Sequence, residues 1–273
     1  MMDIKRILCP IDFSDVSRHA LEHEDATTLA LLAGSDPQRA PRKINQWAYL
    51  REETRVDRVE AFALRTLGDD RALPQTDVST DESSLFGVSC ASINPDRVDS
   101  AVTTVSTRRM TYRMLGHAMD QVVASARWHA RTLSPPGSAT GFLGALERVI
   151  RGAPTALFVY NGAAYDLSVR RRQSLGRRQI EDRTIDPLTR AELVISSRGN
   201  GATTTAFSVT YAPDSAETPL PVQIFYQPSF WISIELRQDD AADVPPDPAE
   251  NQSTLTRIQE ICNVDAMTQA TDR

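Results

Sequence analysis

Two histidines and a glutamate near the N-terminus have the spacing of a metal site. His19, Glu22 and His23 match the pattern H-x-x-E-H, in which both imidazoles bind zinc and the glutamate activates a water molecule. Residues i and i+4 lie on one face of a helix, so this spacing suits a single ion. The site would need a third ligand from elsewhere, and a solvated helix face accounts for the same residues. A zinc-dependent hydrolase is therefore an alternative function.

A second candidate for chemistry is a dense group of arginines. Arg170, Arg171 and Arg172 are consecutive, and Arg177, Arg178 and Arg183 follow them. Planar guanidinium groups bind carboxylates and phosphates in a bidentate manner. The end of a strand followed by a polar loop explains the same residues, because acidic residues between 181 and 186 would neutralise part of the charge. The sequence leaves both interpretations open and favours the polar loop.

Aromatic residues mark a possible contact surface in the last strands. Phe225 and Tyr226 are neighbours, as are Phe230 and Trp231. Successive side chains of a strand point to opposite faces of a sheet, so one aromatic of each pair should leave the core side. We predict a partner surface that contains Tyr226, Trp231 and the arginines Arg170, Arg171 and Arg172.

The elements that would carry these residues are strands between 154 and 237. Asn161-Gly162 separates two apolar runs, and this dipeptide is the strongest short-range signal for a β-hairpin. Segments 191–197 and 203–211 are rich in β-branched residues and predict a second hairpin. Segments 221–226 and 230–237, separated by a turn containing Pro228, predict a third.

The rest of the chain is predicted to be mainly helical. An apolar run over 4–13 fits a short strand, followed by a helix over 15–32. Residues 52–67 fit a helix, although 59–64 also alternate as a strand would. Two strands over 85–93 and 98–107 are followed by helices over 108–133, over 139–150 and near the C-terminus. We therefore predict an α+β fold, with an antiparallel sheet of hairpins packed against helices and a short N-terminal strand-helix unit.

The N-terminal residues carry a family resemblance. The segment from Lys5 to His23, KRILCPIDFSDVSRHALEH, resembles the opening strand and helix of the universal stress protein family. The resemblance covers residues 4–24 and implies an α/β fold, often dimeric, that binds ATP in many members. It also implies that Asp12, which follows the first strand, faces a nucleotide.

A glycine-rich loop is the second signature of that family. The nearest match here is the segment SSRGNG, which contains Gly199 and Gly201. The family's loop enters a helix whose amides bind phosphates, whereas residues 203–211 fit a strand better. A hairpin turn therefore explains the two glycines, and ATP is expected as a cofactor only under the nucleotide-binding alternative. No P-loop, dinucleotide fingerprint or nucleophile elbow occurs in the sequence.

Composition limits the remaining function classes. The net charge of −6 argues against nucleic acid as a partner, because phosphate binding needs clustered basic residues on a positive surface. Three widely spaced cysteines predict neither a disulfide nor a zinc site and fit a reducing compartment. The sequence predicts no signal peptide and no membrane span, hence a cytoplasmic protein.

The sequence divides into four regions. They are a strand-helix unit over 1–34, a mainly helical region over 44–152, an antiparallel β domain over 153–237, and an acidic, proline-rich linker with a short helix over 238–273. Because no catalytic set emerges, we expect a non-enzymatic binding or assembly protein without a cofactor. Its partner would be another protein or a second copy of the chain. A universal-stress-type ATP or AMP-binding protein and the zinc hydrolase are the alternatives.

Overall fold

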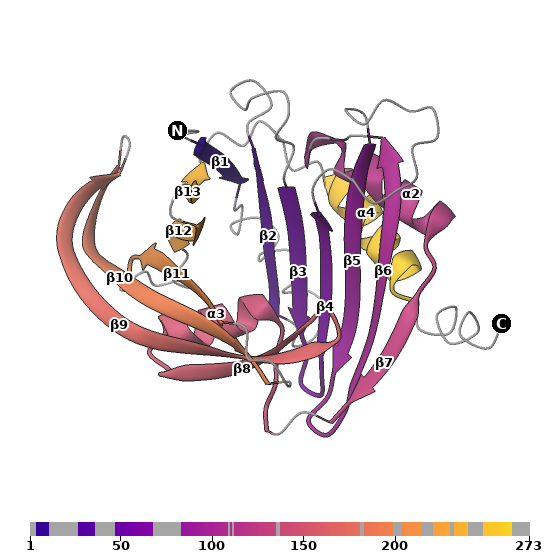
Figure 1. The fold of residues 1–273 in the computed structure, drawn as a ribbon, viewed down its shortest axis with the longest axis horizontal. Helices are drawn as coiled ribbons and strands as arrows, with labels where there is room; N and C mark the ends of the chain where they lie inside the picture. The colour runs from indigo at the N-terminus through magenta and orange to yellow at the C-terminus, as the bar shows by residue number, and fades with distance from the viewer. Residues whose placement is uncertain are drawn as a thin grey trace.

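The computed structural model describes residues 4–10, 27–35, 47–67, 83–108, 110, 112–134, 137–180, 183–198, 204–213, 221–229, 232–239 and 248–263. These residues are mostly β-strands (Figure 1). The strands are β1 (Ile4–Pro10), β2 (Thr27–Ser35), β3 (Trp47–Thr54), β4 (Val59–Thr66), β5 (Ser83–Ile93), β6 (Val98–Arg108), β7 (His129–Leu133), β8 (Thr155–Tyr160), β9 (Ala163–Ile180), β10 (Arg183–Ser197), β11 (Thr204–Tyr211), β12 (Pro221–Ser229) and β13 (Ile232–Asp239).

The strands form two antiparallel meanders. In the N-terminal meander, β1 to β7, and in the C-terminal meander, β8 to β13, each strand pairs with the next along the chain. The meanders join through β1 and β13, which pair in parallel, so the hydrogen-bonded order is continuous from β7 to β8. The described α-helices are α2 (Leu115–Ser125), α3 (Phe142–Ile150) and α4 (Pro248–Ile261), and a 3-10 turn, Tyr112–Met114, precedes α2.

The N-terminal meander is covered on both faces. One face packs against α2 and α4 around buried residues that include Phe62, Leu64 and Phe86. The opposite face of the same strands meets α3 and β8: Ala91 packs with Val159 of β8, and strand β2 packs with Leu143 of α3. Helix α3 in turn packs on β8 to β11 of the C-terminal meander. Thus α3 lies between the two meanders and contacts both (Figure 1).

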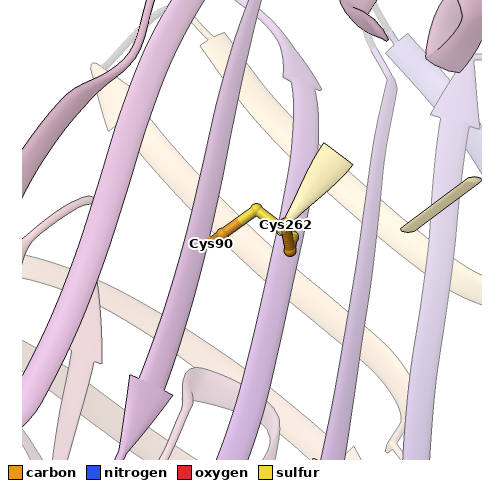
Figure 2. Close-up of a disulfide and its surroundings, with 2 residues drawn as sticks. All are labelled: Cys90 and Cys262. Atoms are coloured by element: carbon orange, nitrogen blue, oxygen red, sulfur yellow. A yellow bond between two sulfur atoms is a disulfide. The ribbon is translucent and has the colours of Figure 1, made fainter. Parts of the chain in front are cut away.

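A disulfide joins α4 to the sheet. Cys90 of β5 is bonded to Cys262, which directly follows α4, across a sequence separation of 172 residues (Figure 2). Ile258 and Ile261 on the same helix are buried in the cluster that contains Cys90. The expectation that the cysteines form no disulfide is therefore wrong. Sequence spacing could not reveal the pair, because eight strands and three α-helices lie between the two cysteines in the described chain.

The predicted α+β fold class is also wrong, since the described chain is mainly β. Residues 52–67, expected as a helix, form the end of β3 and all of β4. In β4, Phe62 and Leu64 enter one core while Ala61 and Ala63 face the other side of the sheet. A strand buried on both faces loses the polar alternation that identifies strands, so a short apolar run cannot be distinguished from a helix by its period.

Two predicted helices also need correction. Residues 27–32 lie in β2, whereas the rest of the helix predicted over 15–32 falls outside the described residues. The helix predicted over 108–133 is α2 only between Leu115 and Ser125, and its last residues form edge strand β7. His129, the first residue of β7, is exposed. The strands predicted over 85–93 and 98–107, and the helix over 139–150, are confirmed as β5, β6 and α3.

All three predicted hairpins are present, with β8–β9, β10–β11 and β12–β13 each paired antiparallel. Tyr160 pairs with Ala163, and between them Asn161 and Gly162 have φ of 49° and 68°. Positive φ at both central residues is the type I′ geometry that Asn-Gly favours. The turn at 199–203 of the second hairpin lies outside the described residues.

Gly162 is expected to tolerate no side chain. Its φ is in the left-handed region, and a Cβ there would lie 3.2 Å from Ser100 Oγ of the other meander. Strain and crowding together should make Gly162→Ala lower the free energy of unfolding by about 1–3 kcal/mol in chemical denaturation. Gly116→Ala in α2 is the control, because no atom lies within 4 Å of its added Cβ. Equal stability of the two variants would contradict the docking of this turn.

The second hairpin extends further than the sequence indicated. β9 continues to Ile180 and β10 begins at Arg183, so the arginines expected in a polar loop lie in paired strands. Leu175 and Gly176 form a bulge, in which Gly176 has φ 61°. This irregularity and the unbroken polar run from 170 to 174 removed the strand pattern from the sequence.

Candidate functional site

Glu52 on β3 is a buried acid at the contact between the two meanders. Glu52 is only 3% exposed to solvent. Its partners on the neighbouring strands are apolar, Leu29 on β2 and Ala61 on β4. A carboxyl group in such surroundings requires hydrogen-bond donors from another element. Those donors come from α3.

The Glu52 carboxyl caps the N-terminus of α3. Its oxygens accept hydrogen bonds from the backbone N–H of Leu143 at 2.5 Å and of Gly144 at 2.8 Å. These are the second and third residues of the helix, and an N-cap side chain normally satisfies their N–H groups. The N-cap of α3 is Gly141, which has no side chain to do so. A residue of the other meander therefore supplies the missing cap.

The glycine at the start of α3 makes room for this carboxyl group, and a second glycine one turn later makes room for Thr140. A Cβ built on Gly141 would overlap the carboxyl group of Glu52, and one built on Gly144 would overlap the hydroxyl of Thr140. Gly141 has φ of −79°, so the backbone itself does not require glycine there. The requirement comes from the close approach of the acid.

The environment of Glu52 changes its ionisation. Burial raises the pKa of Glu52, and the two backbone hydrogen bonds from Gly144 and Leu143 lower it. The effect of burial is the larger, and the resulting pKa is about 7. Glu147 raises the pKa slightly further and Arg148 lowers it. Burial dominates because removing a carboxylate from water costs more free energy than two hydrogen bonds restore. Glu52 is thus an acid whose charge changes near neutral pH.

A small cavity adjoins Glu52. Its lining includes Leu50, Ser89, Phe142 and Tyr160. The centre of a water molecule can occupy only about 10 Å³ of it, which is the room that one water needs. The cavity can supply a water to the acid, and it is far too small for a substrate or nucleotide.

The opposite end of α3 is held by an arginine. The Arg172 guanidinium donates hydrogen bonds to the carbonyls of Val149 at 2.6 Å and Ala153 at 3.0 Å. The last carbonyls of a helix lack internal partners and carry the negative end of its dipole. Helix α3 therefore has an acid from the N-terminal meander at its positive end and a base from the C-terminal meander at its negative end.

Beyond Arg172, β9 and β10 form an arm that leaves the sheet. β8 pairs with β9 only as far as Ser168, and β11 pairs with β10 only from Thr189 onward. Among the described strands, the remaining parts of β9 and β10 pair only with each other, and they curve away from the other strands (Figure 1). We call residues 170–180 and 183–190 the arginine arm. Its base, residues 170–174 and 189–190, still belongs to the sheet, because β10 pairs there with β11.

The arm is positively charged in an acidic protein. Residues 170–190 contain seven arginines and three acidic residues, whereas the whole chain has a net charge of −6. Arg170, Arg171, Arg177 and Arg178 are exposed. No ion pair seen in the described ranges includes any of these four. By contrast, exposed Arg97 and Arg198 are paired with Asp99 and Asp166.

The predicted partner surface is only partly described. Arg170 and Arg171 are exposed on the arm, and Arg172 contacts α3 instead. Tyr226 is partly buried and pairs with Phe207, which packs on the α3 side of the sheet. Its neighbour Phe225 is the exposed aromatic, at 38%. Trp231 falls outside the described residues.

The residues of both alternative sites also fall outside the described residues. They are Asp12, Gly199 and Gly201 for the nucleotide, and His19, Glu22 and His23 for zinc. Where the structure describes the chain, no three His, Cys, Asp or Glu side chains gather to hold a metal ion. Within the same ranges, no helix has the length and apolar character needed to cross a membrane.

Glu52 could not be recognised from the sequence. It lies in a segment expected as a helix, where an acid is unremarkable, and its partners are 91 and 92 residues away. The available signal was indirect. Helix α3 begins at Gly141 without a capping side chain, and such a helix needs an acceptor from elsewhere.

Comparison with known proteins identifies no family for this chain. The chain matches no family model, no curated protein and no solved structure.

Proposed function

We propose that the chain is a non-enzymatic binding protein that uses the arginine arm to dock an acidic protein partner. The observation that carries this proposal is the exposure of four arginines that form no ion pair among the described residues, on a hairpin whose outer part leaves the sheet. Some exposed arginines of the described chain bind carboxylates, as Arg97 and Arg198 do, whereas others, such as Arg127 and Arg131, have no ion pair among the described residues. A partner with carboxylates would give the arm the bidentate contacts that guanidinium groups favour.

The shape of the arm supports a protein surface as the partner. Strand residues advance about 3.3 Å each, so Arg171 and Arg178 lie roughly 20 Å apart along the ribbon. An acidic surface of that extent could contact both ends at once. The acidic remainder of the chain disfavours nucleic acid, because it would repel a continuous phosphate backbone around the arm.

The enzymatic and nucleotide-binding alternatives stay predictions. Their residues lie outside the described ranges, and the cavity beside Glu52 is too small to serve either.

Binding of a fluorescent poly-L-glutamate peptide, followed by anisotropy at low salt, tests the proposal. We expect the variant with Arg170, Arg171, Arg177 and Arg178 all changed to Gln to bind at least about tenfold more weakly than the wild type, since four charge-assisted contacts are lost. Arg172 is left intact because it holds α3.

A matched control separates local from general charge effects. Four arginines that already have carboxylate partners, Arg55, Arg97, Arg198 and Arg257, are changed to Gln, which gives the same net charge. This control should bind like the wild type. Equal loss in both variants, or tighter binding of a short DNA duplex than of the peptide, would refute the assignment of the partner.

The compartment also belongs to this proposal. The composition led us to expect the cytoplasm, yet structural disulfides persist mainly where thiols are oxidised. The Cys90–Cys262 bond therefore favours an oxidising compartment as the place where the protein binds its partner. Thiol titration of the freshly purified, unfolded chain should find one free thiol of the three cysteines, and three free thiols would refute this.

A further inference from the structure

Helix α3 connects the N-terminal meander to the base of the arm. Glu52 of β3 holds its first turn and Arg172 of β9 holds its last. Arg172 is also the first arm residue on the α3 side of the sheet, where it pairs with the fully buried Ala191. A change in the position of α3 on β3 should therefore also change the position of Arg172 at the base of the arm.

We propose that α3 docks on β3 through a proton-linked contact, in which uptake of one proton by the buried Glu52 carboxyl holds the helix and the base of the arginine arm in the position seen here. This proton-linked contact would regulate the position of the arm, and the proposal rests on the proposed function. It stands on the enclosed carboxyl group, on Gly141, whose Cβ would overlap that group, and on the water-sized cavity beside it.

Few charged groups compete with Glu52 for this role. From α3, Glu147 and Arg148 act on it with opposite signs. From β8, the Tyr160 ring lines the same cavity, and the Arg65 guanidinium of β4 lies 5.4 Å from the centre of that ring. The cross-strand neighbours Leu29 and Ala61 carry no charge. Glu52 is accordingly the group of this contact that titrates between pH 5 and pH 8.

The direction of the effect follows from linkage. With α3 docked, the pKa of Glu52 is about 7, and an undocked helix would leave it solvated near the ordinary value of 4.5. The docked form binds the proton more tightly, so docking is favoured at low pH and weakens as pH rises through 7. With these two pKa values the docking equilibrium changes by about 70-fold between pH 5 and pH 8.

The carboxyl carbon resonance of Glu52, followed by NMR in the full-length protein, tests the contact without any variant. We expect a midpoint near pH 7. Hydrogen exchange of the α3 amides, corrected for the intrinsic pH dependence, should show protection rising from pH 8 to pH 5. Glu52→Gln should show no such change over this range, and Glu260→Gln, on an exposed site of α4, should behave like the wild type.

Two results would overturn the inference. One is a Glu52 midpoint near 4.5, and the other is α3 protection that does not depend on pH in the wild type.

Transmission to the arm is tested by the hydrogen exchange of residues 173–180. This exchange should slow on acidification in the wild type only, and unchanged exchange there would refute the transmission. None of these readouts needs a partner. Failure of the peptide-binding test would remove the proposed function and leave this result standing.

Discussion

Simultaneous replacement of Cys90 and Cys262 by serine is expected to lower the free energy of unfolding by as much as about 5 kcal/mol. The disulfide closes a loop across 172 residues, and the chain-entropy model gives this magnitude for so long a loop. Helix α4 should loosen first, because beyond the bond it is held mainly by Ile258 and Ile261 on the sheet and by packing on α2. Denaturation with guanidinium chloride under non-reducing conditions measures the change.

Reductant supplies the control for the disulfide. Dithiothreitol should destabilise the wild type to nearly the level of the double variant and should leave the double variant unchanged. A wild type whose unfolding midpoint does not respond to reductant would show that the bond is absent in solution.

Gly141→Ala is expected to lower the free energy of unfolding by about 3 kcal/mol. The added Cβ would overlap the Glu52 carboxyl group, so the acid must move away from the N–H groups of Leu143 and Gly144. Those buried donors then lose their acceptor, which costs about 1–3 kcal/mol for each unsatisfied group. Chemical denaturation at pH 7 measures the loss.

Helix propensity alone would predict the opposite effect of Gly141→Ala on stability. Alanine is normally the better residue near a helix, and Gly116→Ala in the open part of α2 should be neutral or slightly stabilising. If Gly141→Ala behaved in the same way, Glu52 would not occupy the first turn of α3. The double variant Gly141→Ala with Glu52→Ala removes the overlap but leaves the same two N–H groups without their acceptor, so it should be about as unstable as Gly141→Ala alone.

Local signals allowed part of the fold to be predicted. The three C-terminal hairpins are confirmed because each has a turn with its own chemistry, as Asn161-Gly162 shows by its positive φ values. The β5–β6 pair is confirmed for a similar reason, since residues 94–97 form a tight reversal closed by the bond from Asn94 N–H to the Arg97 carbonyl.

Non-local contacts explain what could not be predicted. β4 looked helical because both of its faces are buried, and the coverage by α4 on one side and by α3 and β8 on the other comes from distant parts of the chain. The disulfide and the Glu52 contact also join residues more than 90 positions apart. The arginines were recognised from sequence. Their place on a paired arm was not, because a polar strand that leaves the core has no apolar period.

Hydrogen exchange of the full-length protein with and without bound poly-L-glutamate locates the binding surface without any mutation. If the arginine arm binds the peptide, exchange should slow across residues 170–190, with the exposed Phe225 side of β12 and the α2–α4 face unchanged. Protection confined to β12 or to the α2–α4 face, or no protection of the arm at saturating peptide, would contradict binding by the arm.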